Sequence, residues 1–233
     1  MKLINLFLLF SFLTLVVSCK KDIARAAPNT SLTIINASFN NQSINASISD
    51  TIVPFYINQA PIYYQSFNEY GVPFGNVPLI LVSATDTSSP LLQATFNLQA
   101  GAVYSLYITD NPKGIDTVFM QDNITNYSDS LAGLRFINLA WGSMPISVNL
   151  AGNLPSQTEF VNLSYKTISR FKTYPDTNGI SNYNFEIRDQ MSGNLLSTFS
   201  WNFTLFKNNT LVLTGSEDPS SSDPISVFQV NNY

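Results

Sequence analysis

The sequence contains no histidine and one cysteine, and only 11% of its 233 residues are charged. Without histidine, neither a Ser-His-Asp nor a Cys-His catalytic group nor an imidazole metal site is available. A single cysteine excludes an internal disulfide, a zinc knuckle and an iron–sulfur cluster. Eleven basic residues against fifteen acidic ones give a net charge of −4, which argues against nucleic acid as a partner. The composition nominates no catalytic residue, metal or cofactor.

The first residues combine a basic start with a short apolar segment. Lys2 precedes an apolar run from Leu3 to Val17. This run is shorter than the roughly 20 residues that a membrane-spanning helix needs. A basic residue, a short apolar core and small residues at its end are typical of a secretory signal peptide. We therefore predict a signal peptide over residues 1–18.

The end of this run, Leu15-Val16-Val17-Ser18-Cys19, resembles a bacterial lipobox. The resemblance implies cleavage before Cys19, thioether lipidation of its sulfur and N-acylation. Residues 19–30 are then expected to be a lipidated tether, because two or three acyl chains suffice for stable membrane attachment. We expect a cell-envelope protein anchored by lipid, with the outer membrane as its location and the exposed face left open. The alternative is an ordinary signal peptide or short buried helix in which Cys19 is an incidental small residue.

Downstream of the tether the sequence repeats itself at a slowly growing offset. Leu32–Ala37 matches Leu134–Leu139 at an offset of 102, and Val72-Pro73 matches Tyr174-Pro175 at the same offset. Further matches are Leu79–Leu81 with Phe185–Ile187 at 106, Leu92, Ala94, Phe96 and Leu98 with Phe199, Trp201, Phe203 and Leu205 at 107, Tyr104 and Leu106 with Leu211 and Leu213 at 107, and Val118-Phe119 with Val227-Phe228 at 109. We predict two modules, residues 31–123 and 133–233, joined by residues 124–132.

Each module has the pattern of an all-β domain. Phe199–Leu205 alternates large apolar and polar residues, as expected for a strand with one buried face. Turn-forming residues separate the strand-like runs, which favours an antiparallel sandwich or barrel. The predicted strands are Leu32–Ala37, Val77–Ala84, Leu91–Leu98, Val103–Thr109, Thr117–Gln121, Leu134–Leu139, Ile146–Leu150, Tyr183–Arg188, Leu195–Leu205, Thr210–Thr214 and Ile225–Val230.

Both modules open with a strand that ends in Asn and a small residue, as in Ile35-Asn36-Ala37-Ser38 and Ile137-Asn138-Leu139-Ala140. Aromatic residues then precede a corner at Phe67–Gly75 and Tyr165–Gly179, and a hairpin closes on Gln99–Tyr104. This pattern resembles the bacterial family known as domain of unknown function 4397, here in two tandem copies within a Bacteroidota-type envelope lipoprotein. The resemblance implies immunoglobulin-like β-sandwiches in the cell envelope. It implies no established activity, so no catalytic residue is carried over.

Two kinds of acidic residue are candidates for chemistry. Glu159 and Glu186 are a candidate carboxylate pair for hydrolysis, although solvated strand and loop charges are the simpler interpretation. The acidic turns Asp110–Asp116 and Glu217–Asp223 offer oxygen ligands for calcium, but neither has EF-hand spacing. Polar loops with Asp-based turns are the simpler interpretation there too.

The segment from Ile62 to Phe74 is dense in aromatic rings, and Tyr63, Tyr64, Phe67 and Tyr70 are the candidate binding residues. Tyrosine rings stack on sugar faces and anchor protein interfaces. The alternative is that these rings close the ends of the sandwich. We predict a lipid-anchored, non-catalytic module that binds a glycan or a protein, or serves a structural role. The alternatives are an envelope or polysaccharide hydrolase and a surface stalk or spacer. The oligomeric state is left open.

Overall fold

The computed structural model describes residues 29–49, 60–154, 156–176, 182–218 and 220–232. The predicted signal peptide, Cys19 and the tether up to residue 28 lie outside these ranges. The strands are β1 (Thr30–Asn36), β2 (Ser43–Ser47), β3 (Ile62–Tyr63), β4 (Ser66–Val72), β5 (Gly75–Ser83), β6 (Pro90–Leu98), β7 (Val103–Asn111), β8 (Gly114–Gln121), β9 (Leu131–Asn138), β10 (Ile146–Leu150), β11 (Thr158–Leu163), β12 (Lys172–Pro175), β13 (Asn182–Asp189), β14 (Leu195–Asn202), β15 (Asn208–Thr214) and β16 (Ser226–Asn231). Across the described ranges, no helix has the length and apolar character required to cross a bilayer.

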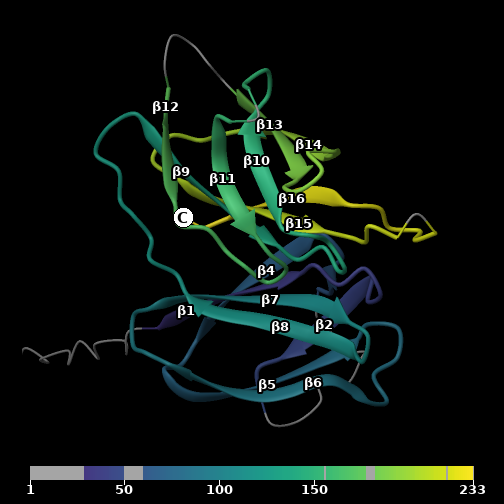
Figure 1. Cartoon of the computed structure of the whole chain (residues 1–233). Helices are drawn as coiled ribbons and strands as arrows, with labels where there is room; N and C mark the ends of the chain where they lie inside the picture. The colour runs from purple at the N-terminus through teal and green to yellow at the C-terminus, as the bar shows by residue number, and fades with distance from the viewer. Residues whose placement is uncertain (1–28, 50–59, 155, 177–181, 219, 233) are drawn as a thin grey trace, which may run out of the picture.

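The strands form four sheets arranged as two tandem β-sandwich modules. The first module has the sheets β4-β1-β7-β8 and β3-β2-β5-β6, and the second has β12-β9-β15-β16 and β11-β10-β13-β14. Adding eight to every strand number of the first module gives the second, so the two modules share one topology. Figure 1 shows the four sheets stacked, with the first module below the second. We call β4-β1-β7-β8 and β12-β9-β15-β16 the inner sheets and the other two the outer sheets.

Each module contains one parallel strand pair in an otherwise antiparallel arrangement. β1 runs parallel to β7, and β9 runs parallel to β15. Between β1 and β7 the chain builds β2 and β3 in the outer sheet, returns to the inner sheet for β4, and then builds β5 and β6 in the outer sheet. A parallel pair requires a long connection of this kind. β1 and β2 lie in different sheets, whereas the first two strands of an immunoglobulin domain share one. The sandwich layering is therefore immunoglobulin-like, but the strand order is different.

The core of each module lies between its outer and inner sheet. In the second module Trp201, Phe185 and Phe136 are completely buried, and alternation along β14 directs Phe199 and Trp201 inward. The Trp201 ring meets the Tyr174 ring edge to face at 5.5 Å. The core of the first module is mostly aliphatic, and its buried members are Leu32, Ile34, Ile44, Ala46, Ile62, Val72, Val77, Leu79, Leu81, Leu98, Tyr104, Leu106 and Ile108.

A third apolar cluster joins the two modules through the outer faces of their inner sheets. Its buried members are Ile35, Ala37, Tyr107, Ile137, Leu139, Val212, Phe228 and Val230. The central strands of both inner sheets are thus covered on both faces, and every residue of β15 is buried. Strands buried on both faces read as continuous apolar runs rather than as an alternation. This explains why the adjacent residues Ile34 and Ile35, which point to opposite faces of β1, are both apolar and completely buried.

Two hydrogen bonds across this interface are equivalent to each other. The Thr214 hydroxyl donates to the Ala37 carbonyl at 2.6 Å, and the Thr109 hydroxyl donates to the Leu139 carbonyl at 3.2 Å. Ala37 and Leu139 are related by the offset of 102, and Thr109 and Thr214 occupy matching positions of β7 and β15. Reciprocal contacts of this kind define an isologous, two-fold interface. The chain therefore contains within itself the arrangement of a symmetric dimer.

The strand ladders test the sequence matches between the modules. Val72 pairs with Thr30 as Tyr174 pairs with Ala132, so the offset of 102 is correct for the first and fourth strands of each module. Ladder positions also give the expected offset of 106 between β5 and β13. These matches of the predicted duplication are confirmed.

Three later matches are wrong in register. Ile34 pairs with Leu106 as Phe136 pairs with Leu211, so the offset from β7 to β15 is 105 rather than 107. The same value relates β6 to β14. A slip of two residues keeps every side chain on its face, so the hydrophobic pattern does not reveal it.

The last strand shows a slip of one residue. Tyr107 pairs with Val118 as Val212 pairs with Phe228, so the offset from β8 to β16 is 110 rather than 109. A one-residue slip exchanges the two faces of a strand. In the structure Val118 and Phe228 both contact the apolar cluster between the modules, which fixes the register.

Candidate functional site

A cavity of about 690 Å³ opens at the junction of the two modules. It is lined by equivalent loops from each module. The first module contributes the β1–β2 loop and the β7–β8 hairpin, and the second contributes the β9–β10 and β15–β16 loops. The lining residues are Phe39, Asn40, Asp110, Asn111, Pro112, Trp141, Gly142, Ser216, Glu217, Asp218 and Ser221. We call this cavity the junction site.

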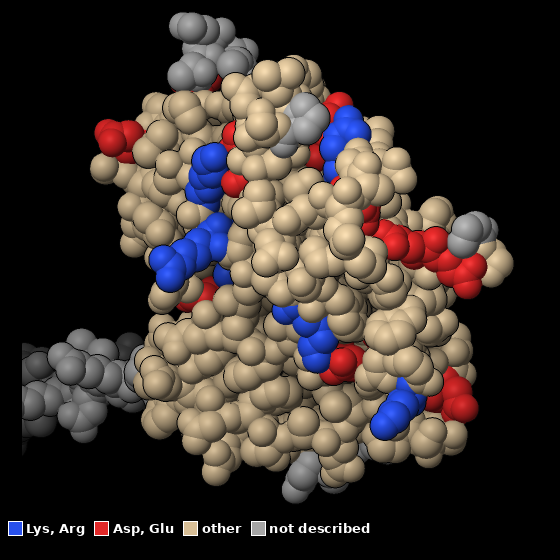
Figure 2. All heavy atoms as spheres, viewed as in Figure 1, with Lys and Arg blue, Asp and Glu red and all other residues tan. Residues whose placement is uncertain are grey.

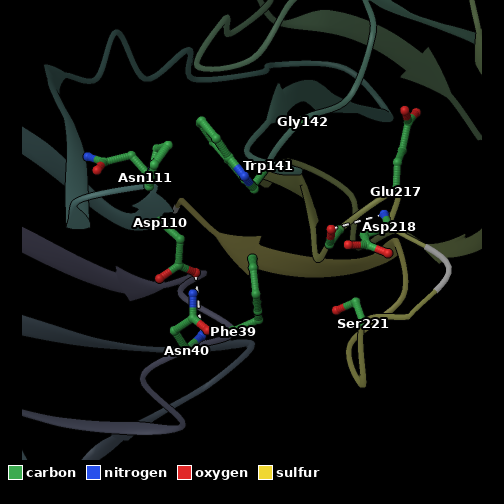
Figure 3. A pocket seen from close by; sticks show the side chains of 11 residues that line it. Phe39, Asn40, Asp110, Asn111, Trp141, Gly142, Glu217, Asp218 and Ser221 are labelled. Atoms are coloured by element: carbon green, nitrogen blue, oxygen red, sulfur yellow. Dashed lines mark hydrogen bonds between the residues drawn. The ribbon is translucent and has the colours of Figure 1, made fainter.

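Two aromatic rings stand in the middle of the junction site. Phe39 and Trp141 are separated by 102 residues, so they occupy equivalent positions in the two modules, and both are half-buried. Tyr165 holds the indole of Trp141 edge to face, with ring centroids 5.5 Å apart and an interplanar angle of 85°. Figure 3 shows both rings between the segment of Asp110 and the loop of Glu217.

Asp110 forms one wall of the junction site. Its side chain is buried and accepts a hydrogen bond from the Ser38 hydroxyl at 2.6 Å. Its other carboxylate oxygen faces the Asn40 amide nitrogen at 3.5 Å, and the Tyr165 hydroxyl donates to its main-chain carbonyl. Burial raises the pKa of the Asp110 carboxyl, and the Ser38 hydrogen bond partly offsets this effect. The carboxylate thus ties the β7–β8 hairpin to the β1–β2 loop.

The β15–β16 loop forms the opposite wall. The Asp218 carboxylate accepts hydrogen bonds from the Ser220 amide at 2.9 Å and the Ser220 hydroxyl at 2.7 Å. These bonds lower the pKa of the exposed Asp218 carboxyl. Partial burial raises the pKa of Glu217, and the charge of Asp189 adds to this effect. The Ser216 hydroxyl accepts a hydrogen bond from the Asp218 main-chain amide at 3.1 Å. Hydrogen bonds between neighbouring residues therefore fix the conformation of this loop.

The junction site unites the two acidic turns that the sequence offered as calcium ligands. Asp110 comes from one turn, and Glu217 and Asp218 come from the other. Among the described residues, however, no group of three or more acidic side chains has a geometry suited to a metal ion. The turns give the cavity an acidic wall on each side, and no basic residue lines it.

The four predicted binding rings do not share a surface. Tyr63 is 61% exposed, whereas the hydroxyl of Tyr64 is buried and has no hydrogen-bond partner among the residues that the structure describes. Phe67 packs against the cluster between the modules, and Tyr70 packs against the core of the first module. Phe67 and Tyr70 lie three residues apart on β4 and therefore face opposite sides of the sheet. Burial raises the pKa of the Tyr70 hydroxyl.

The candidate carboxylate pair is also not brought together. Glu159 lies on β11 and Glu186 on β13, and β10 separates these strands in the outer sheet. Glu159 forms an ion pair with Lys172, and Glu186 forms one with Arg188 at 2.9 Å. Each carboxylate has a cation of its own, so the pair lacks the shared cleft that glycoside hydrolysis needs.

Sequence reasoning did not select Phe39 or Trp141. Phe39 and Trp141 each lie two residues after the end of the matched segments, and the offset of 102 between the two modules still holds at these positions. Continuing the repeat alignment by one or two residues was therefore the signal that could have found them. The closeness of the two equivalent loops follows from the packing of the inner sheets, which the repeat alone does not predict.

Comparisons with known proteins do not assign this site. No family model and no curated protein matches the chain. One similar solved structure is the carbohydrate-binding module CBMbc (family CBM26) from Eubacterium rectale Amy13K in complex with maltoheptaose, with 13% identity, 86% of this chain and 97% of that chain covered, and a TM-score of 0.29. Another is a putative cell adhesion protein from Bacteroides uniformis, with 10% identity, 88% and 98% covered, and a TM-score of 0.22. Scores this low carry no argument about function.

Proposed function

We propose that this protein is a non-catalytic module that binds a glycan at the junction site. The observation that carries the proposal is the pair of equivalent rings, Phe39 and Trp141, inside a cavity of about 690 Å³ whose walls bear carboxylate, hydroxyl and amide groups. Sugar rings present apolar C–H faces and hydroxyl edges. Aromatic rings pack against such faces, while a few polar groups fix the orientation of the ligand.

The geometry of the junction site assigns apolar contact and hydrogen bonding to different residues. Trp141 offers the larger apolar surface, and its contact with Tyr165 fixes the plane of the indole before a ligand arrives. A ring held in advance loses little conformational entropy on binding. Glu217 and Asp218 on the opposite wall offer acceptors for sugar hydroxyl groups.

Hydrolysis is the competing function, because Asp110 and Glu217 both line the cavity and both have a raised pKa. A glycosidase needs an acid and a second carboxylate that both reach the scissile bond. Asp110 instead directs its oxygens to Ser38 and Asn40, where they hold two loops together. This engagement supports binding without catalysis.

Trp141→Ala is expected to weaken glycan binding by about tenfold or more, because a ring at the centre of a binding site dominates the affinity. The wild-type protein is first screened on a glycan array, and the retained glycan is then titrated by calorimetry. Tyr63→Ala is the matched control, since Tyr63 is an exposed ring outside the junction site. Equal losses in the two variants, or no glycan retained by the wild type, would contradict the proposal.

The same proposal places the protein in the cell envelope, attached through lipid on Cys19. Its support is the sequence Leu15–Cys19 with the preceding apolar run. Cells that express the wild type in the presence of a radioactive fatty acid should yield labelled protein. Cys19→Ala should yield none, and labelling that persists in this variant would disprove the anchor.

A further inference from the structure

A second cavity, of about 550 Å³, also lies where the two modules meet. It is lined by Arg135 within β9, whereas the junction site is lined by residues that follow the end of β9. Its lining comes from the end of β8 and the segment after it, from β9, and from the loop between β11 and β12. The lining residues are Met120, Gln121, Asn123, Thr125, Arg135, Ile168, Ser169, Arg170 and Phe171. We call it the arginine cavity.

Arg135 is buried at this cavity and fixed on three sides. Its Nε donates to the Thr210 hydroxyl at 2.8 Å, and its Nη2 donates to Asp122 at 2.5 Å and to the Tyr107 hydroxyl at 3.3 Å. The Phe171 ring covers the guanidinium, with Cζ 4.5 Å from the ring centroid. Nη1 makes no hydrogen bond to any residue that the structure describes, so it is the donor left for a ligand.

The charge balance of the arginine cavity is positive. Asp122, which does not line the cavity, neutralises Arg135 through an ion pair. Arg170 is exposed and forms no ion pair with the described residues. No acidic residue lines the cavity, although acidic residues outnumber basic ones in the whole chain. Figure 2 shows basic atoms at the left edge near the level where the modules meet, with acidic atoms next to them, and acidic atoms at the right edge. The charged residues that line the arginine cavity are all basic, whereas those that line the junction site are all acidic.

The second module alone supplies this cation. The residue equivalent to Arg135 in the first module is Thr33, which is also buried. A buried guanidinium carries a large desolvation cost, which is offset only by well-formed hydrogen bonds. An apolar residue would serve packing at this position without that cost. A binding role explains why an arginine, rather than an apolar residue, occupies position 135 beside an open cavity.

We infer that the arginine cavity binds an oxyanion, either a carboxylate or a sulfate or phosphate group, through Arg135 Nη1 and the Arg170 guanidinium. A guanidinium presents parallel N–H donors that match the oxygens of these groups. Arg135 is held rigidly by its other bonds, and Arg170 adds the uncompensated charge. The amides of Gln121 and Asn123 stand at the same cavity as further donors.

The test titrates the protein at low ionic strength with sodium sulfate, with sodium glucuronate and with glucose as the neutral control. The two anions distinguish a tetrahedral from a planar ligand, and saturable binding of either one is the expected result. Arg170→Gln should weaken this binding by about tenfold. Lys113→Gln removes the same charge from an exposed lysine outside the arginine cavity and should leave the affinity unchanged.

Arg170 is chosen for substitution because it is exposed, whereas loss of Arg135 would leave Asp122 unpaired and affect folding. The thermal midpoint of Arg170→Gln should equal that of the wild type, which separates binding from stability. Absence of saturable binding to both anions would overturn the inference. Equal weakening by Arg170→Gln and Lys113→Gln would also overturn it, because it would indicate attraction to net charge alone.

Discussion

Asp122→Ala is expected to lower the free energy of unfolding by about 3–5 kcal/mol, because it leaves a buried guanidinium without its counter-charge. Arg135 and Asp122 are both almost completely buried, and their side chains meet at 2.5 Å. The Ser105 hydroxyl donates to the second carboxylate oxygen at 2.6 Å and loses its acceptor as well. Chemical denaturation of the two proteins at neutral pH measures the difference.

Two further variants isolate the cause of this loss. Asp129→Ala removes an exposed carboxylate from the same region and should change the stability by less than about 0.5 kcal/mol. The double variant Asp122→Leu with Arg135→Met should be more stable than Asp122→Ala, since it leaves no buried charge. A loss below about 1 kcal/mol in Asp122→Ala, the range of a surface pair, would contradict the burial of this ion pair.

Ile137→Ala is expected to cost about 2–5 kcal/mol, because it opens a cavity in the apolar cluster between the modules. Ile137 is completely buried there, and its equivalent in the first module, Ile35, lies in the same cluster. Both modules depend on this cluster, so thermal unfolding of the variant should remain a single transition at a lower temperature. Scanning calorimetry measures the midpoint and the number of transitions.

The matched variants for this result are Ile35→Ala and Val161→Ala. Ile35→Ala should cost a similar amount, because the interface is two-fold and the two isoleucines contact the same cluster. Val161 is 57% exposed, so Val161→Ala should change the stability little. Two well-separated transitions in Ile137→Ala would show that the modules unfold independently and would contradict a shared core.

Much of the fold could be predicted from the sequence because the strands that pack both cores have strong patterns. Ile146–Leu150 is predicted with the bounds that β10 has in the structure. β2 was not predicted, because Ser43–Ser47 contains only two apolar side chains, Ile44 and Ala46. β4 was not predicted either, because its two rings are divided between two faces and Val72 is its only other large apolar residue.

The parallel pairing and the packing of the inner sheets lay beyond sequence reasoning. A run such as Leu32–Ala37 shows that a strand is buried but does not name the surface that covers it. The junction site was not predicted for the same reason. It is made by four loops, and loop residues such as Phe39 and Trp141 carry no periodic signal.

The two-fold packing of the modules has a consequence for valency. Duplication of a domain ordinarily doubles the number of sites, but the junction site takes equivalent loops from both halves. A cavity shared between two copies exists once, so the described part of one chain offers one such cavity rather than two. Under the proposed glycan binding and lipid attachment, multivalent attachment to a repetitive polysaccharide would come from many chains side by side on one surface, with the spacing of their anchors setting the effective concentration.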